Sequence, residues 1–208
     1  MTGRAETPTI GLILAGGLAR RMGGGDKALK PLAGRPILAH VVDRLRGQCD
    51  GLLLNANGDP ARLAAFGLPV VADTVPDFAG PLAGVLAGLD WIAALRPQTG
   101  WLLSVAADTP FIPDDLAARL HHMRLAAGTP LACAASAGRQ HHAIGLWPVT
   151  LREDLRAALV AGERRLGRWT QGHGVAVAEW PAEPIDPFFN VNTPEDLAEA
   201  ERLAAGAS

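Results

Sequence analysis

The stretch from Ile10 to Lys27 constrains the fold of this chain more than any other part of its sequence. It begins with an apolar run of strand length and opens directly into a glycine-rich loop that carries Arg20, Arg21 and Lys27. In an open α/β sheet, ligands bind just beyond the carboxyl ends of the strands, where this loop would lie. Glycines let the backbone approach a ligand closely, and their N–H groups can bind anions. The positive charges of the two arginines and the lysine attract anions as well. The stretch therefore predicts a strand followed by a cradle for a polyphosphate.

Neither of two common phosphate-binding patterns fits this loop. The P-loop pattern G-x-x-x-x-G-K-[ST] fails because Ala28 follows Lys27, so no hydroxyl is in place for magnesium. The dinucleotide pattern G-x-G-x-x-G fails because Leu18 stands where Gly16 would need its second glycine. A plain glycine turn with solvated arginines would explain the glycines but not the ordered Arg-Met-Gly-Gly-Gly-Asp-Lys that follows. The loop therefore follows a third pattern, which is neither the P-loop nor the dinucleotide-binding loop.

Composition narrows the class of protein. The chain has 208 residues, enough for one domain with a full core, and 49% of them are hydrophobic. A formal net charge of −2 argues against nucleic-acid binding through bulk charge. The 2 cysteines, Cys49 and Cys133, lack the spacing of a zinc site. The sequence shows no signal peptide and no apolar run long enough for a membrane span, so we expect a cytoplasmic protein without a membrane partner.

Apolar runs of strand length alternate with segments of helical periodicity up to about residue 128. This alternation predicts an α/β fold, a single domain built on a doubly wound, mostly parallel sheet. The expected strands are 10–15, 52–54, 69–72, 101–106, 130–136, 143–147 and 175–180. The expected helices are 37–45, 60–66, 82–95, about 113–126, 150–161, 163–171 and 194–203. A polar turn at 137–142 is expected between the strands 130–136 and 143–147, and His121 and His122 are expected to be solvated on their helix.

Polar residues follow three of the expected strands. Asn55, Asp73 and Asp108 each stand where a strand ends, as the glycine loop does. Right-handed crossovers place the carboxyl ends of parallel strands at one edge of the sheet. We therefore expect these residues and the loop to form one site, although they are far apart in the sequence.

With these motifs in hand, the chain resembles the molybdenum cofactor guanylyltransferases over nearly its whole length. The resemblance rests on the blocks Leu14-Ala15-Gly16-Gly17 through Lys27, Asn55-Ala56-Asn57, Asp73, Gly80-Pro81-Leu82-Ala83-Gly84, Asp108-Thr109-Pro110, Ala161-Gly162-Glu163-Arg164-Arg165 and Asn190-Val191-Asn192-Thr193-Pro194. It implies a Rossmann-like nucleotidyltransferase fold and transfer of GMP from GTP to the terminal phosphate of molybdopterin, with release of pyrophosphate. It also implies a nucleotide-binding half at about 1–128 and a molybdopterin-binding half at about 129–208. One departure is His141-His142, where a His-Pro pair is expected.

The resemblance also implies roles for individual residues. Asp108 would hold Mg²⁺, and Lys27 and Arg21 would stabilise the phosphate charge as catalytic residues. Asn190 and Asn192 would bind molybdopterin, and His141 and His142 could face the same substrate. The residues expected to contact the nucleotide are Leu14, Ala15, Gly16, Gly17, Lys27, Asn55, Asp73 and Asp108.

The chemistry of such a transfer fits a site without a strong base. Joining two phosphate-bearing molecules needs positioning and charge neutralisation more than covalent help from the protein. The attacking phosphate monoester, with a second pKa of about 6, is already largely ionised at pH 7. An Mg²⁺ ion on one carboxylate, with lysine and arginine beside it, would supply the neutralisation.

Three other functions compete with guanylyl transfer. A cytidylyltransferase acting on the same cofactor would share the loop and the aspartate. A nucleotidyltransferase for another phosphorylated small molecule is a second rival, and a non-catalytic nucleotide-binding or cofactor-carrier protein is a third. The expected small-molecule partners are GTP and molybdopterin, with transient contact to molybdenum-insertion proteins or molybdoenzyme chaperones as a further expectation.

Overall fold

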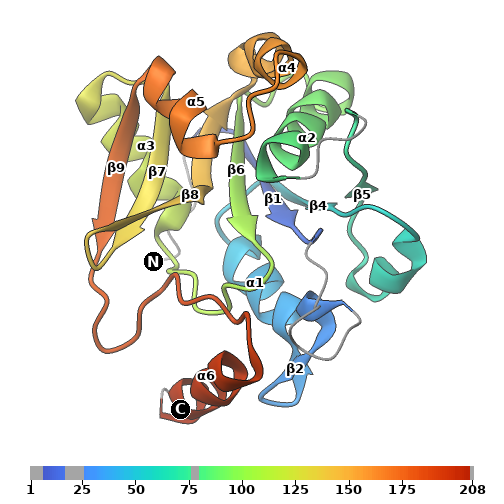
Figure 1. The fold of residues 1–208 in the computed structure, drawn as a ribbon, viewed down its shortest axis with the longest axis vertical. Helices are drawn as coiled ribbons and strands as arrows, with labels where there is room; N and C mark the ends of the chain where they lie inside the picture. The colour runs from blue at the N-terminus through green and yellow to red at the C-terminus, as the bar shows by residue number, and fades with distance from the viewer. Residues whose placement is uncertain (1–6, 17–25, 76–79, 207–208) are drawn as a thin grey trace.

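The computed structural model describes residues 7–16, 26–75 and 80–206, which form a seven-stranded sheet with helices on both faces (Figure 1). The strands lie in the order β5-β4-β1-β6-β8-β7-β9. Only β8 runs antiparallel to its neighbours among these strands, and the other pairs are parallel. Their bounds are β1 Thr9–Leu14, β4 Gly51–Asn55, β5 Val70–Val71, β6 Trp101–Ala106, β7 Leu131–Ser136, β8 Arg139–Pro148 and β9 Val175–Trp180. The prediction of a doubly wound, mostly parallel sheet is confirmed.

Two layers of helices cover the sheet and bury its apolar runs. The helices α1 (Ile37–Arg46) and α3 (Leu116–Ala127) pack on one face. The helices α2 (Pro81–Leu95), α4 (Arg152–Val160) and α5 (Leu166–His173) pack on the other. The central strand β1 sends Ile13 into the first core and Leu12 into the second. A strand covered on both faces has no polar side, and this is why residues 10–15 read as a continuous apolar run.

A small third layer lies beyond the carboxyl ends of the strands. It consists of the short helix η2 (Lys27–Leu29), the hairpin β2 (Pro31–Leu32) and β3 (Arg35–Pro36), and the last helix α6 (Pro194–Gly206). In Figure 1 the arrowheads of β6 and β9 point toward the end of the molecule where α6 and β2 lie. Leu32, Val191 and Ala200 form the shared core of this layer. The C-terminal segment therefore returns to the edge at which the glycine loop begins.

The predicted turn at 137–142 is wrong in length. Only Ala137 and Gly138 form the turn, with φ of 48° and 72°, as in the tight two-residue turns that join antiparallel strands. Arg139 already pairs with Ser136, and β8 continues through His141 and His142. Pairing of Arg139, Gln140 and His141 with β7 overrides their polar character, and the strand continues through His142.

Other elements match the expectations with smaller shifts. The strands at 101–106 and 175–180 begin and end where predicted, whereas β5 is reduced to two residues. The predicted helix 60–66 is the 3₁₀ helix η3 (Pro60–Phe66), and a further 3₁₀ turn, η4 (Val149–Leu151), precedes α4. His121 is buried at 5% exposure, which contradicts its expected solvation. None of the helices in the described ranges is long and apolar enough to cross a membrane.

Candidate active site

A cavity of about 320 Å³ lies at the carboxyl ends of β1, β4 and β6. Its walls come from segments that range from Leu14 to Ala143 in the chain. The lining residues are Leu14, Ala15, Gly16, Lys27, Ala28, Asn55, Asn57, Asp73, Gly80, Pro81, Ala106, Ala107, Asp108 and Ala143. The predicted nucleotide-site residues that the structure describes all line this cavity. Gly17 and Arg21 lie outside the described residues.

Lys27 and Asp108 meet at one side of the cavity. The Lys27 ammonium forms an ion pair with Asp108 Oδ2 and donates a second hydrogen bond to Asn192 Oδ1 at 2.8 Å. Both charged side chains are largely shielded, with 17% and 13% of their side-chain surface exposed. Asp108 lies two residues beyond the end of β6, and Lys27 begins η2. The carboxyl end of the sheet thus brings together a fixed negative and a fixed positive charge.

The short helix that carries Lys27 is fixed by Asp26. The Asp26 carboxylate accepts a hydrogen bond from the Ala28 N–H at 3.2 Å, which caps η2. Its other oxygen accepts from Arg62 Nε at 3.0 Å, which ties η2 to η3. The Lys27 backbone is therefore held independently of its ion pair.

The C-terminal segment supplies the other side of this cluster. The Val191 N–H donates to the Asp108 carbonyl at 2.9 Å, and Asn192 reaches Lys27. The N–H groups of Asn192 and Thr193 both donate to Asp196 Oδ2 at 2.9 Å, so the turn before α6 is rigidly built. Of the two residues that were predicted to bind molybdopterin, Asn192 thus contacts Lys27, which lines the cavity.

Asn190 and the histidine pair lie around the same edge but outside the cavity lining. Within the described residues, the Asn190 side-chain oxygen and His142 Nδ1 are buried without a hydrogen-bond partner. The His142 ring packs against Gly167 of α5. His141 contacts Phe188 and shares a 2.8 Å hydrogen bond with Ser136 Oγ. Burial lowers the pKa of His141, and the nearby Asp186 carboxylate partly opposes that effect.

An irregularity in β8 shapes the wall beside the histidines. Ala134 pairs with His141 and Cys133 with Gly145, so residues 142–144 have no partner on β7. The freed Ala143 carbonyl accepts a 2.8 Å hydrogen bond from Ser104 Oγ, and Ala143 lines the cavity. Bulges of this kind occur next to active sites, where they redirect side chains.

At the far side of the cavity, two amide side chains hold Asp73. Asn55 Nδ2 donates to Asp73 Oδ1 at 3.0 Å, and Asn57 Nδ2 donates to Asp73 Oδ2 at 2.8 Å. The Asp73 N–H in turn donates to Asn57 Oδ1 at 2.9 Å. Asn55 is buried at 6% exposure at the end of β4. The Asp73 carboxylate is therefore fixed in direction.

Gly84, which the sequence analysis quoted without a role, packs directly against the cavity residues Asn55 and Leu14. A Cβ placed there would lie 2.3 Å from Asn55 Oδ1 and 2.7 Å from Leu14 Cδ2. Only a glycine in α2 leaves room for the Asn55 side chain. The signal was present in the Gly-Pro-Leu-Ala-Gly block, but the contact could not be predicted without the packing of α2 on β1 and β4.

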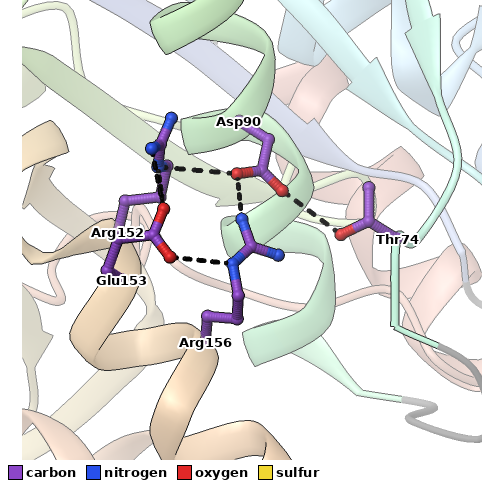
Figure 2. Close-up of polar contacts among 5 residues, drawn as sticks. All are labelled: Thr74, Asp90, Arg152, Glu153 and Arg156. Carbon is purple, nitrogen blue, oxygen red and sulfur yellow. Dashed lines mark hydrogen bonds and ion pairs between the residues drawn. The ribbon is translucent and has the colours of Figure 1, made fainter.

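A charged network ties the turn after Asp73 to two helices (Figure 2). Asp90 of α2 accepts a hydrogen bond from Arg156 Nη2 at 2.5 Å and from Thr74 Oγ1 at 3.3 Å. Arg152 Nε lies 3.7 Å from the same Asp90 carboxylate, and both arginines also bind Glu153. Figure 2 shows these groups converging from α2, α4 and the Thr74 turn. None of these five residues lines the cavity.

Arg164 and Arg165 do not line the cavity. Their backbone N–H groups both donate to Glu163 Oε1 at 2.8 Å. These hydrogen bonds lower the pKa of Glu163. The structure thus shows a turn built around Glu163 before α5.

No cluster of three or more His, Cys, Asp or Glu side chains that could hold a metal occurs among the described residues. A metal at Asp108 would therefore need ligands from a bound substrate. The two cysteines are free and buried, and burial raises the pKa of Cys49 to about 12 and of Cys133 to about 11. Neither thiol contributes to the cavity.

Comparison of the sequence with known proteins finds a matching family and similar relatives. Residues 11–197 match the model of the MobA-like NTP transferase domain. A molybdenum cofactor guanylyltransferase from Rhodopseudomonas palustris (strain BisB5) is 60% identical over 205 residues, covering 98% of this chain and 97% of the relative.

Two solved structures share the fold at low sequence identity. The molybdopterin-guanine dinucleotide biosynthesis protein A of Archaeoglobus fulgidus has a TM-score of 0.73 at 19% identity, covering 95% of this chain and 99% of that one. Rv0371c of Mycobacterium tuberculosis H37Rv, in complex with manganese, has a TM-score of 0.66 at 20% identity, covering 94% and 99%. With a family match over residues 11–197 and relatives of this identity, the chain belongs to the family of MobA-like NTP transferase domains.

Proposed function

We propose that this chain is a molybdenum cofactor guanylyltransferase, which transfers GMP from GTP to the terminal phosphate of molybdopterin and releases pyrophosphate. One observation carries the proposal. Lys27 and Asp108 meet in a cavity at the carboxyl edge of the sheet, in a chain that is 60% identical over nearly its full length to a relative of that name.

In this proposal the cavity receives the nucleotide. Leu14, Ala15 and Gly16, followed by Gly17, contact GTP at the end of β1, and Asn55 and Asp73 bind its nucleoside. The Ala15 N–H already donates to the Asn55 carbonyl at 2.8 Å, so its contact to the nucleotide uses other atoms. Residues 1–128 make up the nucleotide-binding half.

The donor set at Asp108 fits a magnesium ion that arrives with its nucleotide. Mg²⁺ is commonly bound through one or two carboxylates together with substrate phosphates, and Asp108 offers one shielded carboxylate beside the loop. The structural neighbour Rv0371c was solved with manganese, which supports a divalent cation. When bound, Mg²⁺ supplies charge neutralisation at the phosphate oxygens.

The chain's own cations complete the phosphate site. Lys27 is positioned by η2 and provides a compact positive charge for the phosphates, and Arg21 of the glycine loop provides another. The attacking phosphate is already ionised near neutral pH, so no residue has to remove a proton. The enzyme then works by orienting two anions and offsetting their repulsion.

The second substrate belongs to the C-terminal half, residues 129–208. Asn190 and Asn192 bind molybdopterin at the side of the cavity where the C-terminal segment meets Asp108. Molybdenum-insertion proteins or molybdoenzyme chaperones would contact the same half when the product is passed on. A cytoplasmic location remains a prediction.

Transfer assays with labelled nucleotides test this function directly. The enzyme is incubated with molybdopterin, Mg²⁺ and GTP, CTP or ATP that carries the label on the α-phosphate. We expect label in the dinucleotide product with GTP alone, and one pyrophosphate released per transfer. Transfer of CMP without GMP would show a cytidylyltransferase, and absence of any transfer would favour a binding or carrier protein.

The two lysines of the chain form a matched pair for the same assay. Lys27→Ala removes the cavity cation and is expected to lower transfer by at least about 10²-fold, as for other groups that stabilise developing charge. Lys30→Ala removes a lysine that does not line the cavity and is expected to retain transfer. Equal losses in both variants would contradict a phosphate role for Lys27.

A further inference from the structure

Two neutral amide side chains hold the Asp73 carboxylate. No ion pair to Asp73 occurs among the described residues, and its partners are the neutral amides of Asn55 and Asn57. Each carboxylate oxygen can accept about two hydrogen bonds and receives one here. One acceptor position on each oxygen is therefore left for a ligand, and Asp73 lines the cavity.

Asn55 and Asn57 hold this carboxylate in different ways. Asn55 is buried, and its amide also donates to the Val71 carbonyl at 3.2 Å. Asn57 is exposed at the mouth of the cavity and makes a reciprocal pair with Asp73 alone, one hydrogen bond to the carboxylate and one from the backbone N–H. Asn57 is thus the residue whose contacts serve Asp73 and nothing else that the structure describes.

We propose that Asn57 is a positioning residue, which orients the Asp73 carboxylate so that it accepts N–H or O–H donors of the bound nucleoside. This inference rests on the proposed function, because it assumes a nucleotide in the cavity. The donors that such a carboxylate can accept are the N–H groups of a guanine edge or the hydroxyls of the ribose. A bidentate acceptor of this kind discriminates strongly, because a ligand that lacks the donor leaves a charged group unpaired.

Two substitutions separate positioning from simple support of the turn. Asn57→Asp keeps an oxygen that accepts the Asp73 N–H, but it loses the donor and places a second negative charge beside the carboxylate. Asn57→Ala loses both hydrogen bonds. A residue that merely supports the turn would tolerate Asn57→Asp better than Asn57→Ala, whereas a positioning residue would tolerate it worse.

The test measures nucleotide binding by isothermal titration, together with the melting temperature of each variant. We expect GTP to bind Asn57→Asp about tenfold or more weakly than wild type, and Asn57→Ala to lie between them, as for a lost hydrogen bond to a charged group. Thr74→Val is the matched control, because it removes a hydrogen bond from the same turn on the side facing Asp90. This control is expected to bind GTP like wild type.

Analogues identify the donor and exclude a general effect of charge on the triphosphate. The titrations are repeated with inosine triphosphate, which lacks the amino group, and with 2′- and 3′-deoxyguanosine triphosphate. Wild type is expected to discriminate against one of these analogues, and the Asn57 variants are expected to lose that discrimination. Variants that bind GTP within about twofold of wild type, or that keep the full discrimination, would overturn the inference.

The titrations test the role of Asn57 whether or not the chain catalyses transfer. If the wild-type chain bound GTP but transferred no GMP to molybdopterin, the proposed function would fail while the titrations would still decide the role of Asn57. If it preferred CTP, the same variants would be compared on CTP and its deoxy analogues.

Discussion

At the residue scale, Gly84 shows how tightly the nucleoside end of the cavity is packed. Its position in α2 faces the Asn55 amide and the Leu14 side chain, with no space for a methyl group. Contacts below 3.0 Å force a neighbour to move, and Asn55 is fixed by its hydrogen bonds to Asp73 and Val71. The missing side chain at Gly84 is therefore part of the site.

We predict that Gly84→Ala weakens GTP binding by about tenfold, because the displaced Asn55 no longer holds Asp73. Alanine is the better helix former by about 1 kcal/mol, so lost helix propensity cannot explain a loss of binding. Gly88→Ala in the same helix is the control, since its Cβ would press only on Leu12 and Leu102, at 3.0 and 3.1 Å. Titration with GTP should show weaker binding by Gly84→Ala than by Gly88→Ala. Equal GTP affinity of the two variants would contradict the role of Gly84.

Single residues also show where sequence reasoning stops. Lys27, Asn55, Asp73 and Asp108 could be placed at one edge because each follows a strand or belongs to the loop after one. The contact between Lys27 and Asn192 could not be predicted from the sequence. It joins residues 165 positions apart and depends on the path by which the C-terminal segment returns to the site. The Gly84 contact depends likewise on helix packing.

At the element scale, His121 fastens α3 to the start of β1. His121 Nε2 lies 2.8 Å from Thr9 Oγ1, whose own proton goes to the Thr7 carbonyl, so the ring donates here. Arg124 Nε donates to His121 Nδ1 at 3.2 Å, which requires a neutral ring. Burial, reinforced by the Arg124 charge, lowers the pKa of His121 to about 4.

We predict that the hydrogen bond from Arg124 to His121 is lost in acid, because protonation of Nδ1 removes its acceptor and places a second positive charge beside the Arg124 guanidinium. Folding lowers the pKa of His121 from 6.5 to about 4, so the unfolded chain binds a proton more readily than the folded one. The free energy of unfolding is therefore highest above pH 6.5 and falls as the pH drops toward 4. The loss amounts to about 2 to 3 kcal/mol of unfolding free energy. His121→Gln keeps a donor and an acceptor without titrating, so its denaturant-measured stability should decline less than that of wild type between pH 7 and pH 4. Parallel pH profiles of the two proteins would contradict this account.

The elements themselves were predictable to different degrees. β6 and β9 have the predicted bounds because buried strands read as apolar runs between turn residues. The start of β8 was missed because its first residues are polar, although they pair with buried residues of β7. The hairpin of β2 and β3 was missed as well, since each strand has only two residues and Ala33, with φ of 48°, stands before Gly34 where Asn or Asp is typical.

At the scale of the whole molecule, the two ends of the chain form one site. The segment after β1 provides Lys27, the turn after β6 provides Asp108, and the segment before α6 closes on both of them. A sheet with parallel strands collects these groups at one edge, and the short third layer of η2, the β2–β3 hairpin and α6 surrounds them. The fold therefore brings the proposed nucleotide site next to the proposed site for the second substrate.

The central claim is that Asp108 and Lys27 hold a nucleoside triphosphate and its divalent ion between them, and the effect of Mg²⁺ on GTP affinity tests it most directly. Wild type and Asp108→Ala are titrated with GTP in Mg²⁺ and in EDTA, with Asp114→Ala as the control for loss of an exposed carboxylate outside the cavity. We predict that Mg²⁺ strengthens GTP binding by about tenfold or more in wild type and in the control, and by less than about twofold in Asp108→Ala. An undiminished effect of Mg²⁺ in Asp108→Ala would contradict the account.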